Sequence, residues 1–373
     1  MTIVADQPGP HPSSPERPGH PGWVVGVDTH TDTHAAALVD HLGGVRAEVQ
    51  ITADPAGYAQ LVAWATGQLP AGQPLRWSVE GTRSHGHGLT RHLRTAGHTV
   101  FEAPKPVNSR RRRGGKSDPI DAVHAARATL AIDQDPTTHH AIPRADGHRE
   151  ALRILLITRR HDTDHRTATI SLFKSLLLGA TNLPGTLPET LRGLSTARQL
   201  RAVQNLPEDP TTDLETQIRL QALRRAATTI TELNRAVYAN EKQLRTLVEQ
   251  ACPGLLDLPG VGPVTAATLL TTWSHHGRVR NDAAYAALAG ISPLPASSGK
   301  IIRYRLNRGG DRTLNAALHT IVTARRRMGH PPTSDYIARR TTEGRTTNEI
   351  LRCLKRYTIR QLYRYLQANT ITA

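Results

Sequence analysis

The chain has 373 residues, enough for two or three domains that each bury a core. Its 47 Lys and Arg against 31 Asp and Glu give a formal net charge of +16, which indicates a polyanionic partner such as DNA or RNA, although an anionic membrane surface would suit the charge equally well. Residues 1–22 are rich in Pro, His and Gly, and no apolar run has membrane-spanning length. We therefore expect a cytoplasmic protein with a disordered leader. With two cysteines, Cys252 and Cys353, a disulfide framework and a cysteine-based zinc site are excluded.

Residues 23–132 alternate between strand-like and helix-like patterns. Strands are predicted at 23–30, 34–40, 45–52, 75–82 and 99–104, and helices at 54–69, 84–98 and 117–132. Three strands followed by helix, strand, helix, strand and helix is the order of a ribonuclease-H-like α/β fold.

Residues 132–148 are polar and contain prolines, which is typical of a linker. The next region, 147–250, is predicted to be helical, with long helices at 147–178 and 211–250. In the second helix, apolar residues recur every seven positions over four repeats, and Asn240 interrupts the stripe. A helical hairpin and a coiled-coil dimer would both use such a stripe, and the pattern favours neither.

Residues 251–373 form the third predicted region, which is mostly helical and ends in a basic helix at 348–367. It contains "LPGVGPVTAATLL", in which two glycines separated by one apolar residue precede a helix. This is the pattern of a helix-hairpin-helix. We expect the backbone N–H groups of Gly260 and Gly262 to hold a phosphate without reading base sequence, whereas a plain turn between helices is the structural alternative.

Four acids stand where the predicted α/β fold would bring them together. Asp28 and Glu80 end strands that are neighbours in a ribonuclease-H-like sheet, and Asp118 and Asp121 share one face at the start of the last helix. Four such carboxylates repel one another unless cations lie between them, and two magnesium ions about 4 Å apart are the usual solution. Each acid alone has an ordinary explanation: Asp118 before Pro119 also suits a helix N-cap.

Four histidines of the predicted α/β region do not indicate a zinc site, because their spacing matches no zinc-ligand pattern. These are His30, His34, His85 and His87.

A serine motif follows in "GISPLPASSGK", which has the form Gly-x-x-Pro-x-x-x-x-Ser-Gly and leads into a basic run. From its chemistry alone, Ser298 is either an ordinary loop hydroxyl or a nucleophile activated by nearby cations. Because Ser297 is adjacent, the motif does not decide which of the two serines would be the nucleophile. Lys300 and Arg303 in the basic run are expected to contact nucleic acid.

A second basic run, "SRRRRGGK", precedes the helix that carries the acid pair. Its four consecutive arginines are expected to contact a phosphate backbone, and a solvated loop is the alternative. They are Arg110, Arg111, Arg112 and Arg113.

Taken together in this order, the acids, the glycine pair and the serine motif resemble the insertion-sequence one-ten group of transposases, which includes the Piv-type DNA invertases. The resemblance covers about residues 23–330. It implies a RuvC-like domain with a DEDD magnesium site, a coiled-coil middle that assembles protomers, and a C-terminal domain with a catalytic serine at Ser298.

The resemblance also implies strand exchange through a covalent 5′-phosphoserine. The implied partners are donor and target DNA, a structured bridge RNA and further copies of the chain, as a dimer and as a tetramer in the synaptic complex. A nucleoid-associated location would follow. Two other hypotheses remain at this level. One is a junction-resolving endonuclease that uses the same acids with water, and the other is a non-catalytic nucleic-acid packaging protein.

Overall fold

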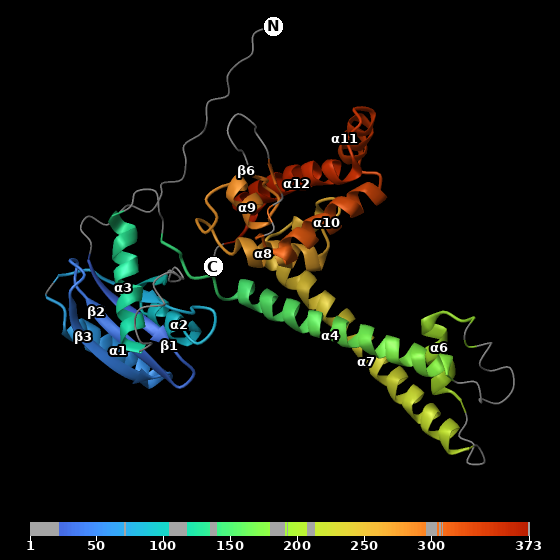
Figure 1. Cartoon of the computed structure of the whole chain (residues 1–373), viewed down its shortest axis with the longest axis horizontal. Coiled ribbons are helices and arrows are strands. Elements are labelled where there is room, and N and C mark those ends of the chain that lie inside the picture. Colours follow the sequence, from blue (N-terminus) through green and yellow to red (C-terminus); the bar gives the residue numbers. More distant parts are fainter. Residues whose placement is uncertain are drawn as a thin grey trace, which may run out of the picture. The chain divides into compact units, whose positions relative to one another are not determined.

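The structure is a computed structural model that describes residues 22–70, 72–103, 118–134, 140–179, 191, 193–206, 213–295, 304–305, 307 and 309–371. The chain divides into two compact units, residues 1–144 and 145–373. The fold class expected from the sequence is found at this level: a mixed α/β N-terminal unit is followed by a mostly helical remainder (Figure 1).

The first unit contains a five-stranded mixed sheet in the order β3-β2-β1-β4-β5. The strands and helices follow the predicted order, which is confirmed. Their bounds are β1 Trp23–Thr29, β2 Thr33–Val39, β3 Val45–Thr52, α1 Pro55–Gly67, β4 Leu75–Val79, α2 His87–Thr95, β5 Thr99–Glu102 and α3 Asp118–Gln134. Strands β1 to β3 pair antiparallel, while β4 lies parallel to both β1 and β5.

The two faces of this sheet are covered by different helices. On one face Val25 and Val27 pack with Leu61 of α1 and Leu89 of α2. On the other face Val24 packs against α3. Because both faces of β1 are covered, its sequence is continuously apolar up to Asp28.

Part of the predicted linker is structured on the sheet. Ala141 forms an isolated antiparallel bridge with Glu102 at the end of β5, and the Glu102 N–H donates to the Ala141 carbonyl at 2.7 Å. The ring of His140 stacks on Phe101 with centroids 4.0 Å apart. Residues 140–141 therefore belong to the first unit, as an addition to the free edge of β5.

The second unit begins with a helical hairpin. Its long helices are α4 His148–Leu178 and α7 Leu214–Ala251, which lie side by side, and the short helix α6 Thr196–Gln204 packs against α7 (Figure 1). The seven-residue stripe of α7 is buried inside this chain: Leu223 and Ile230 pack with Phe173 of α4, whereas Leu244 packs with Leu152.

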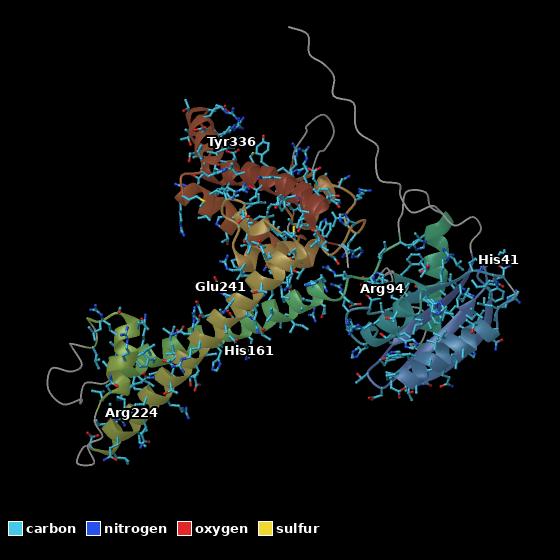
Figure 2. All side chains as sticks on the ribbon, turned by 180° about the vertical axis from the view of Figure 1, so that it is seen from behind. His41, Arg94, His161, Arg224, Glu241 and Tyr336 are labelled. Atoms are coloured by element: carbon cyan, nitrogen blue, oxygen red, sulfur yellow. The ribbon has the colours of Figure 1, made fainter. Side chains whose placement is uncertain are left out.

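Asn240 lies within this stripe and bonds to the partner helix. Its Nδ2 donates to the Leu155 carbonyl at 2.9 Å, which fixes the register of α4 against α7. One position later Glu241, labelled in Figure 2, accepts from Arg159 of α4 at 2.9 Å. The stripe that fitted both a hairpin and a dimer thus serves the hairpin in this structure.

The rest of the second unit packs around one core built on α8. Its elements are the short helix η1 Leu255–Asp257, α8 Pro263–Trp273, α9 Asp282–Leu288, β6 Leu294–Pro295, β7 Tyr304–Arg305, α10 Arg312–Arg327, α11 Pro331–Thr342 and α12 Thr347–Asn369. The core joins Leu269 and Trp273 of α8 to Leu318 of α10 and Leu362 of α12. No helix within the described ranges is long and apolar enough to cross a membrane.

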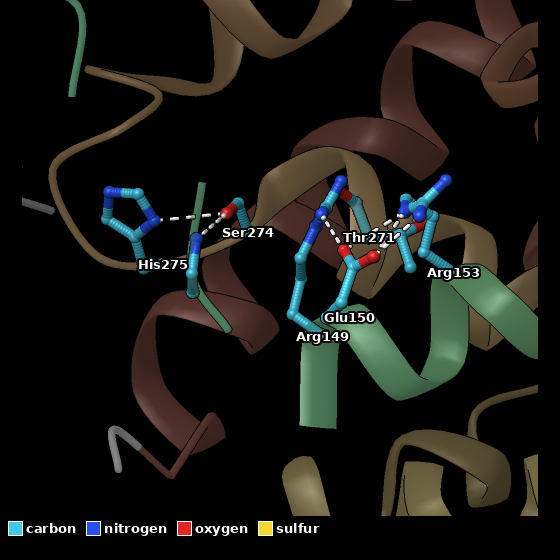
Figure 3. A network of polar contacts seen from close by, with 7 residues as sticks. Arg149, Glu150, Arg153, Thr271, Ser274 and His275 are labelled. Carbon is cyan, nitrogen blue, oxygen red and sulfur yellow. Dashed lines mark hydrogen bonds and ion pairs between the residues drawn. The ribbon is translucent and has the colours of Figure 1, made fainter. Parts of the chain in front are cut away.

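The start of α4 is bonded to the end of α8 (Figure 3). Buried Arg149 donates to the Thr271 carbonyl and to Glu150, and the Ala145 N–H donates to the hydroxyl of Ser274 at 3.0 Å. Ser274 has φ +75° and ψ −65°, the strained geometry of a γ-turn. The first residues of the second unit are therefore held against the end of α8 by hydrogen bonds.

Candidate active site

Two acids stand at the carboxyl ends of the neighbouring parallel strands β1 and β4. Asp28 is the penultimate residue of β1 and is 7% exposed. Glu80 directly follows β4, and its N–H donates to the Val27 carbonyl at 2.9 Å. The Thr29 hydroxyl donates in turn to the Glu80 carbonyl at 2.9 Å. The strand pairing thus continues past β4 and brings the Asp28 and Glu80 backbones side by side.

Both acids belong to the sheet face that α3 crosses. Gly26, two residues before Asp28, lies so close to α3 that a Cβ atom there would be 2.0 Å from the Ala122 carbonyl oxygen. Ser78, two residues before Glu80, donates its hydroxyl proton to a carbonyl of α3 at 2.9 Å. Side chains two residues apart in a strand share a face, so Asp28 and Glu80 project to the α3 side.

Helix α3 runs along this face in the direction opposite to β1. Val24, near the start of β1, packs with Leu130 near the end of the helix, whereas Gly26 meets Ala122 in an earlier turn. Asp28 lies two residues, or about 7 Å, further along β1. One more helical turn, about 5 Å, reaches the start of α3. These two distances are similar, so Asp28 lies level with the first turn of α3.

That first turn carries the other two predicted acids. Helix α3 begins at Asp118, and Asp121 follows three positions later on the same side of the helix. Asp121 is half-buried, whereas the side chain of Asp118 lies outside the described residues. The fold thus places Asp28, Glu80 and Asp121 toward the same end of one sheet face.

Asp28 also has a histidine partner that the predicted site did not include. Its Oδ2 atom lies 3.2 Å from Nε2 of His30. The spacing of two residues at the end of a strand was the available signal for this pair. Within the described ranges no three His, Cys, Asp or Glu side chains are grouped closely enough to hold a metal ion. Carboxylate oxygens are nevertheless the ligands that magnesium prefers, so the residue types fit a divalent cation.

The glycine turn, residues 258–262, precedes α8 in the second unit. Gly260 has φ +77°, and the Val261 N–H donates to the Leu258 carbonyl at 3.0 Å. The Gly262 N–H donates to the Thr265 hydroxyl at 3.0 Å, so the expectation that it is available to a phosphate is corrected. The Gly260 N–H makes no hydrogen bond within the described part of the chain. Of the two expected donors, Gly260 is the one that remains available.

A buried arginine supports the glycine turn from α10. Arg325 is 5% exposed, and its Nε donates to the Pro259 carbonyl at 2.7 Å. Its Nη1 lies 3.5 Å from the Thr358 hydroxyl, and its Nη2 is buried with no hydrogen-bond partner in the described residues. Burial lowers the pKa of Arg325; burial and the Arg325 charge also lower the pKa of His330. No local pattern distinguishes Arg325 from the exposed arginines that follow it, so its role was not predicted from the sequence.

The candidate nucleophile lies between two short paired strands. Leu294 of β6 pairs with Arg305 of β7, and Pro295 pairs with Tyr304. The connection between them, residues 296–303, is called the serine loop here. Its predicted site residues lie outside the described residues: Ser297, Ser298, Lys300 and Arg303.

The basic run before α3 also falls outside the part of the chain that the structure describes. The expected phosphate contacts of its four arginines therefore stay predictions. These residues are Arg110, Arg111, Arg112 and Arg113.

Two family models match this chain. Residues 25–181 match a transposase model for the DEDD domain of IS110 elements, and residues 252–338 match the transposase IS116/IS110/IS902 family. A protein of Streptomyces coelicolor described as an IS110 insertion element uncharacterized 43.6 kDa protein is 33% identical over 148 residues. That match covers 39% of this chain and 36%, or about a third, of the relative's length.

The first match covers the sheet with its strand-end acids, and the second covers the glycine turn and both ends of the serine loop. Both models describe transposases, and the first is a model of the DEDD class. The relative is likewise described as an IS110 element protein, and the chain belongs to the IS110 family of transposases. The resemblance noted from the sequence is thereby confirmed at the level of the family.

Proposed function

We propose that this protein cuts and rejoins DNA strands, with a divalent-metal site at the strand-end acids and Ser298 as the nucleophile. The observation that carries the proposal is the arrangement of Asp28 and Glu80 on adjacent strand ends, on the face that the start of α3 approaches with Asp121. Several carboxylates at one end of a sheet face repel one another unless they have a positive partner. A cation at this sheet end would provide one.

Together, the four acids would hold two magnesium ions. These acids are Asp28, Glu80, Asp118 and Asp121. Magnesium bound there would supply positive charge to stabilise the phosphate oxygens during strand cleavage. His30 adds a hydrogen-bonding partner that orients the Asp28 carboxylate from its Oδ2 side.

The proposed chemistry conserves the number of phosphate ester bonds. The Ser298 hydroxyl loses its proton as its oxygen attacks a backbone phosphorus, the bond from phosphorus to the 3′ oxygen breaks, and the 3′ oxygen takes up a proton to become a 3′ hydroxyl. The serine then carries the 5′ phosphate. Attack by the 3′ hydroxyl of another strand reverses these steps and frees the serine. No external energy source is needed, because each step exchanges one ester bond for another.

The partners in this proposal are donor DNA, target DNA and a structured bridge RNA. A net charge of +16 suits a protein that binds several nucleic-acid strands, and an aromatic content of 4% favours backbone contacts over base stacking. The glycine turn, as part of a helix-hairpin-helix, would contribute one backbone contact. Assembly into a dimer, and into a tetramer in the synaptic complex, would bring the serine of one protomer to the acids of another.

The test is the covalent intermediate. Protein purified with its RNA is incubated with a plasmid that carries the joined ends of the element, and protein-DNA adducts are separated under denaturing conditions. Ser298→Ala is expected to abolish adducts while retaining DNA binding, whereas Ser297→Ala serves as the matched control. Asp28→Asn should also abolish cleavage. Unchanged cleavage in both Ser298→Ala and Ser297→Ala would favour a metal-dependent nuclease that uses water.

A further inference from the structure

The two ends of the segment that carries the serine loop are held together by backbone contacts. A Cβ atom at Gly310 would lie 2.2 Å from the backbone nitrogen of Gly290, so no side chain fits between them. The Asp311 N–H donates to the Leu288 carbonyl at 2.7 Å. Gly290 itself has φ +67°, a conformation that favours glycine. The first residue of the serine motif is therefore fixed against the start of α10.

A side-chain relay supports the same point from two other helices. Asn315 of α10 donates from Nδ2 to the Ala289 carbonyl at 2.8 Å, directly before Gly290. Lys355 of α12 donates from Nζ to the Oδ1 atom of Asn315 at 2.8 Å. The relay runs from α12 through α10 to the backbone that begins the serine motif.

Lys355 is suited to orient this amide because an ammonium group can only donate hydrogen bonds. The Asn315 oxygen must face Lys355, so the Asn315 nitrogen must face the Ala289 carbonyl. A hydroxyl or an amide at position 355 would permit the reverse orientation. Among the described residues no carboxylate pairs with Lys355. Burial first, and the Arg352 charge second, lower the pKa of Lys355.

We propose that Lys355 and Asn315 form a positioning pair that fixes the start of the segment carrying the serine loop, at Ala289 and Gly290, for strand cleavage. The inference rests on the proposed function, in which Ser298 attacks DNA. It extends that function to α12, which begins at Thr347 and thus lies beyond the segment matched by the family model, 252–338. A half-buried cation without a carboxylate contributes little to stability, so the role of the pair lies in orientation.

The first experiment compares two variants on the same helix. Lys355→Met removes the donor to Asn315, whereas Arg352→Met removes an exposed positive charge one turn away. With wild-type protein, its RNA and the joined-end plasmid in single-turnover conditions, the rate of adduct formation should fall about 10- to 100-fold in Lys355→Met. Arg352→Met should remain within about twofold of wild type. Melting temperature and plasmid affinity should be unchanged in both.

A second variant keeps the contact with Lys355 but removes the hydrogen bond to the Ala289 carbonyl. Asn315→Asp retains an acceptor for Lys355 and loses the donor to the Ala289 carbonyl. We expect a melting temperature close to that of wild type, because the ion pair with Lys355 offsets the lost bond to the Ala289 carbonyl, and an adduct rate as low as that of Lys355→Met. The double variant should be no slower than either single variant, since the residues act as one unit.

Three results would overturn the inference: an unaffected rate in Lys355→Met, equal losses in Lys355→Met and Arg352→Met, or additive losses in the double variant. A purely structural role would lower the melting temperature together with the rate. The proposed function fails separately, if wild-type protein forms no adduct at Ser298. An adduct in wild type and an unimpaired Lys355→Met variant would therefore contradict the positioning pair alone.

Discussion

Gly26 of β1 lies directly against the backbone of Ala122 in α3, with no room for a side chain between them. The contact determines how near α3 comes to the centre of the sheet, and therefore how near Asp121 comes to Asp28. A glycine at this point of a strand weakens the strand intrinsically. Its presence is explained by the close approach of the helix that carries two of the predicted acids.

Gly26→Ala should therefore destabilise the first unit and disable cleavage together. The new methyl group would meet backbone atoms, which cannot move as a side-chain end can, so we expect a loss of about 1 to 3 kcal/mol or more in the free energy of unfolding. Gly67→Ala, where no atom lies within 4 Å of the added Cβ, is the matched control. Urea unfolding of both variants measures the difference. Equal stabilities would show that α3 does not depend on this contact.

His34 should make the stability of the first unit depend on pH. The residue is fully buried on β2, stacked on Tyr58, and burial lowers its pKa; the charges of His30 and His85 act in the same direction. The Thr33 carbonyl and Asp28 oppose the shift.

Because the folded state resists protonation of His34, the unfolded chain binds more protons below its pKa of about 6.5. The free energy of unfolding should thus be greatest above that pH and decrease as the pH falls through 6.5 toward the lower folded pKa. His34→Gln should reduce this slope, whereas His41→Gln, at an exposed position labelled in Figure 2, should not. A slope unchanged by His34→Gln would assign the dependence to other groups.

Arg325 should affect DNA binding without contacting DNA. Its guanidinium is buried and holds the Pro259 carbonyl of the glycine turn. Arg325→Met should weaken binding to nonspecific duplex DNA by roughly 3- to 10-fold, equivalent to the loss of about one hydrogen bond, while the dependence of affinity on salt stays the same. The exposed Arg326→Met variant is the comparison. A salt slope reduced by Arg325→Met would indicate a direct phosphate contact instead.

The basic segment is expected to contact DNA directly, so replacing its residues should change the salt dependence of binding. Its residues are Arg110, Arg111, Arg112 and Arg113. Each arginine that neutralises a phosphate should reduce the salt slope by about 0.7 to 0.9 when it is replaced, because fewer counterions are released on binding. Titrations of duplex DNA and of the purified RNA at several salt concentrations measure this slope for each single Arg→Gln variant. Slopes equal to that of wild type would identify the segment as a solvated loop.

The sequence predicted the strands and long helices well because their patterns are local. The continuous apolar run of β1 and the seven-residue stripe of α7 each specify an element by period alone. The end of β1 at an acid was likewise visible, and it led to the neighbouring Glu80 through the known order of strands.

Contacts between distant residues could not be predicted in this way. The buried position of Arg325 and the bond between Lys355 and Asn315 depend on how α10 and α12 pack, and an arginine or a lysine in a basic helix gives no local sign of burial. The Thr265 hydroxyl that uses the Gly262 N–H was visible as a spacing of three residues, which is a capping pattern. The bridge between residues 141 and 102 shows that a proline-containing polar stretch can still add to a sheet edge.

Iron-directed cleavage of the protein backbone tests most directly whether the acids meet at a divalent cation. Ferrous iron is substituted for magnesium in the full-length protein, ascorbate and peroxide are added, and the fragments are mapped by mass spectrometry. We predict cuts near Asp28, near Glu80 and at the start of α3, suppressed by excess magnesium and absent in Asp28→Asn. Cuts elsewhere, or a pattern that Asp28→Asn leaves unchanged, would contradict a shared metal site.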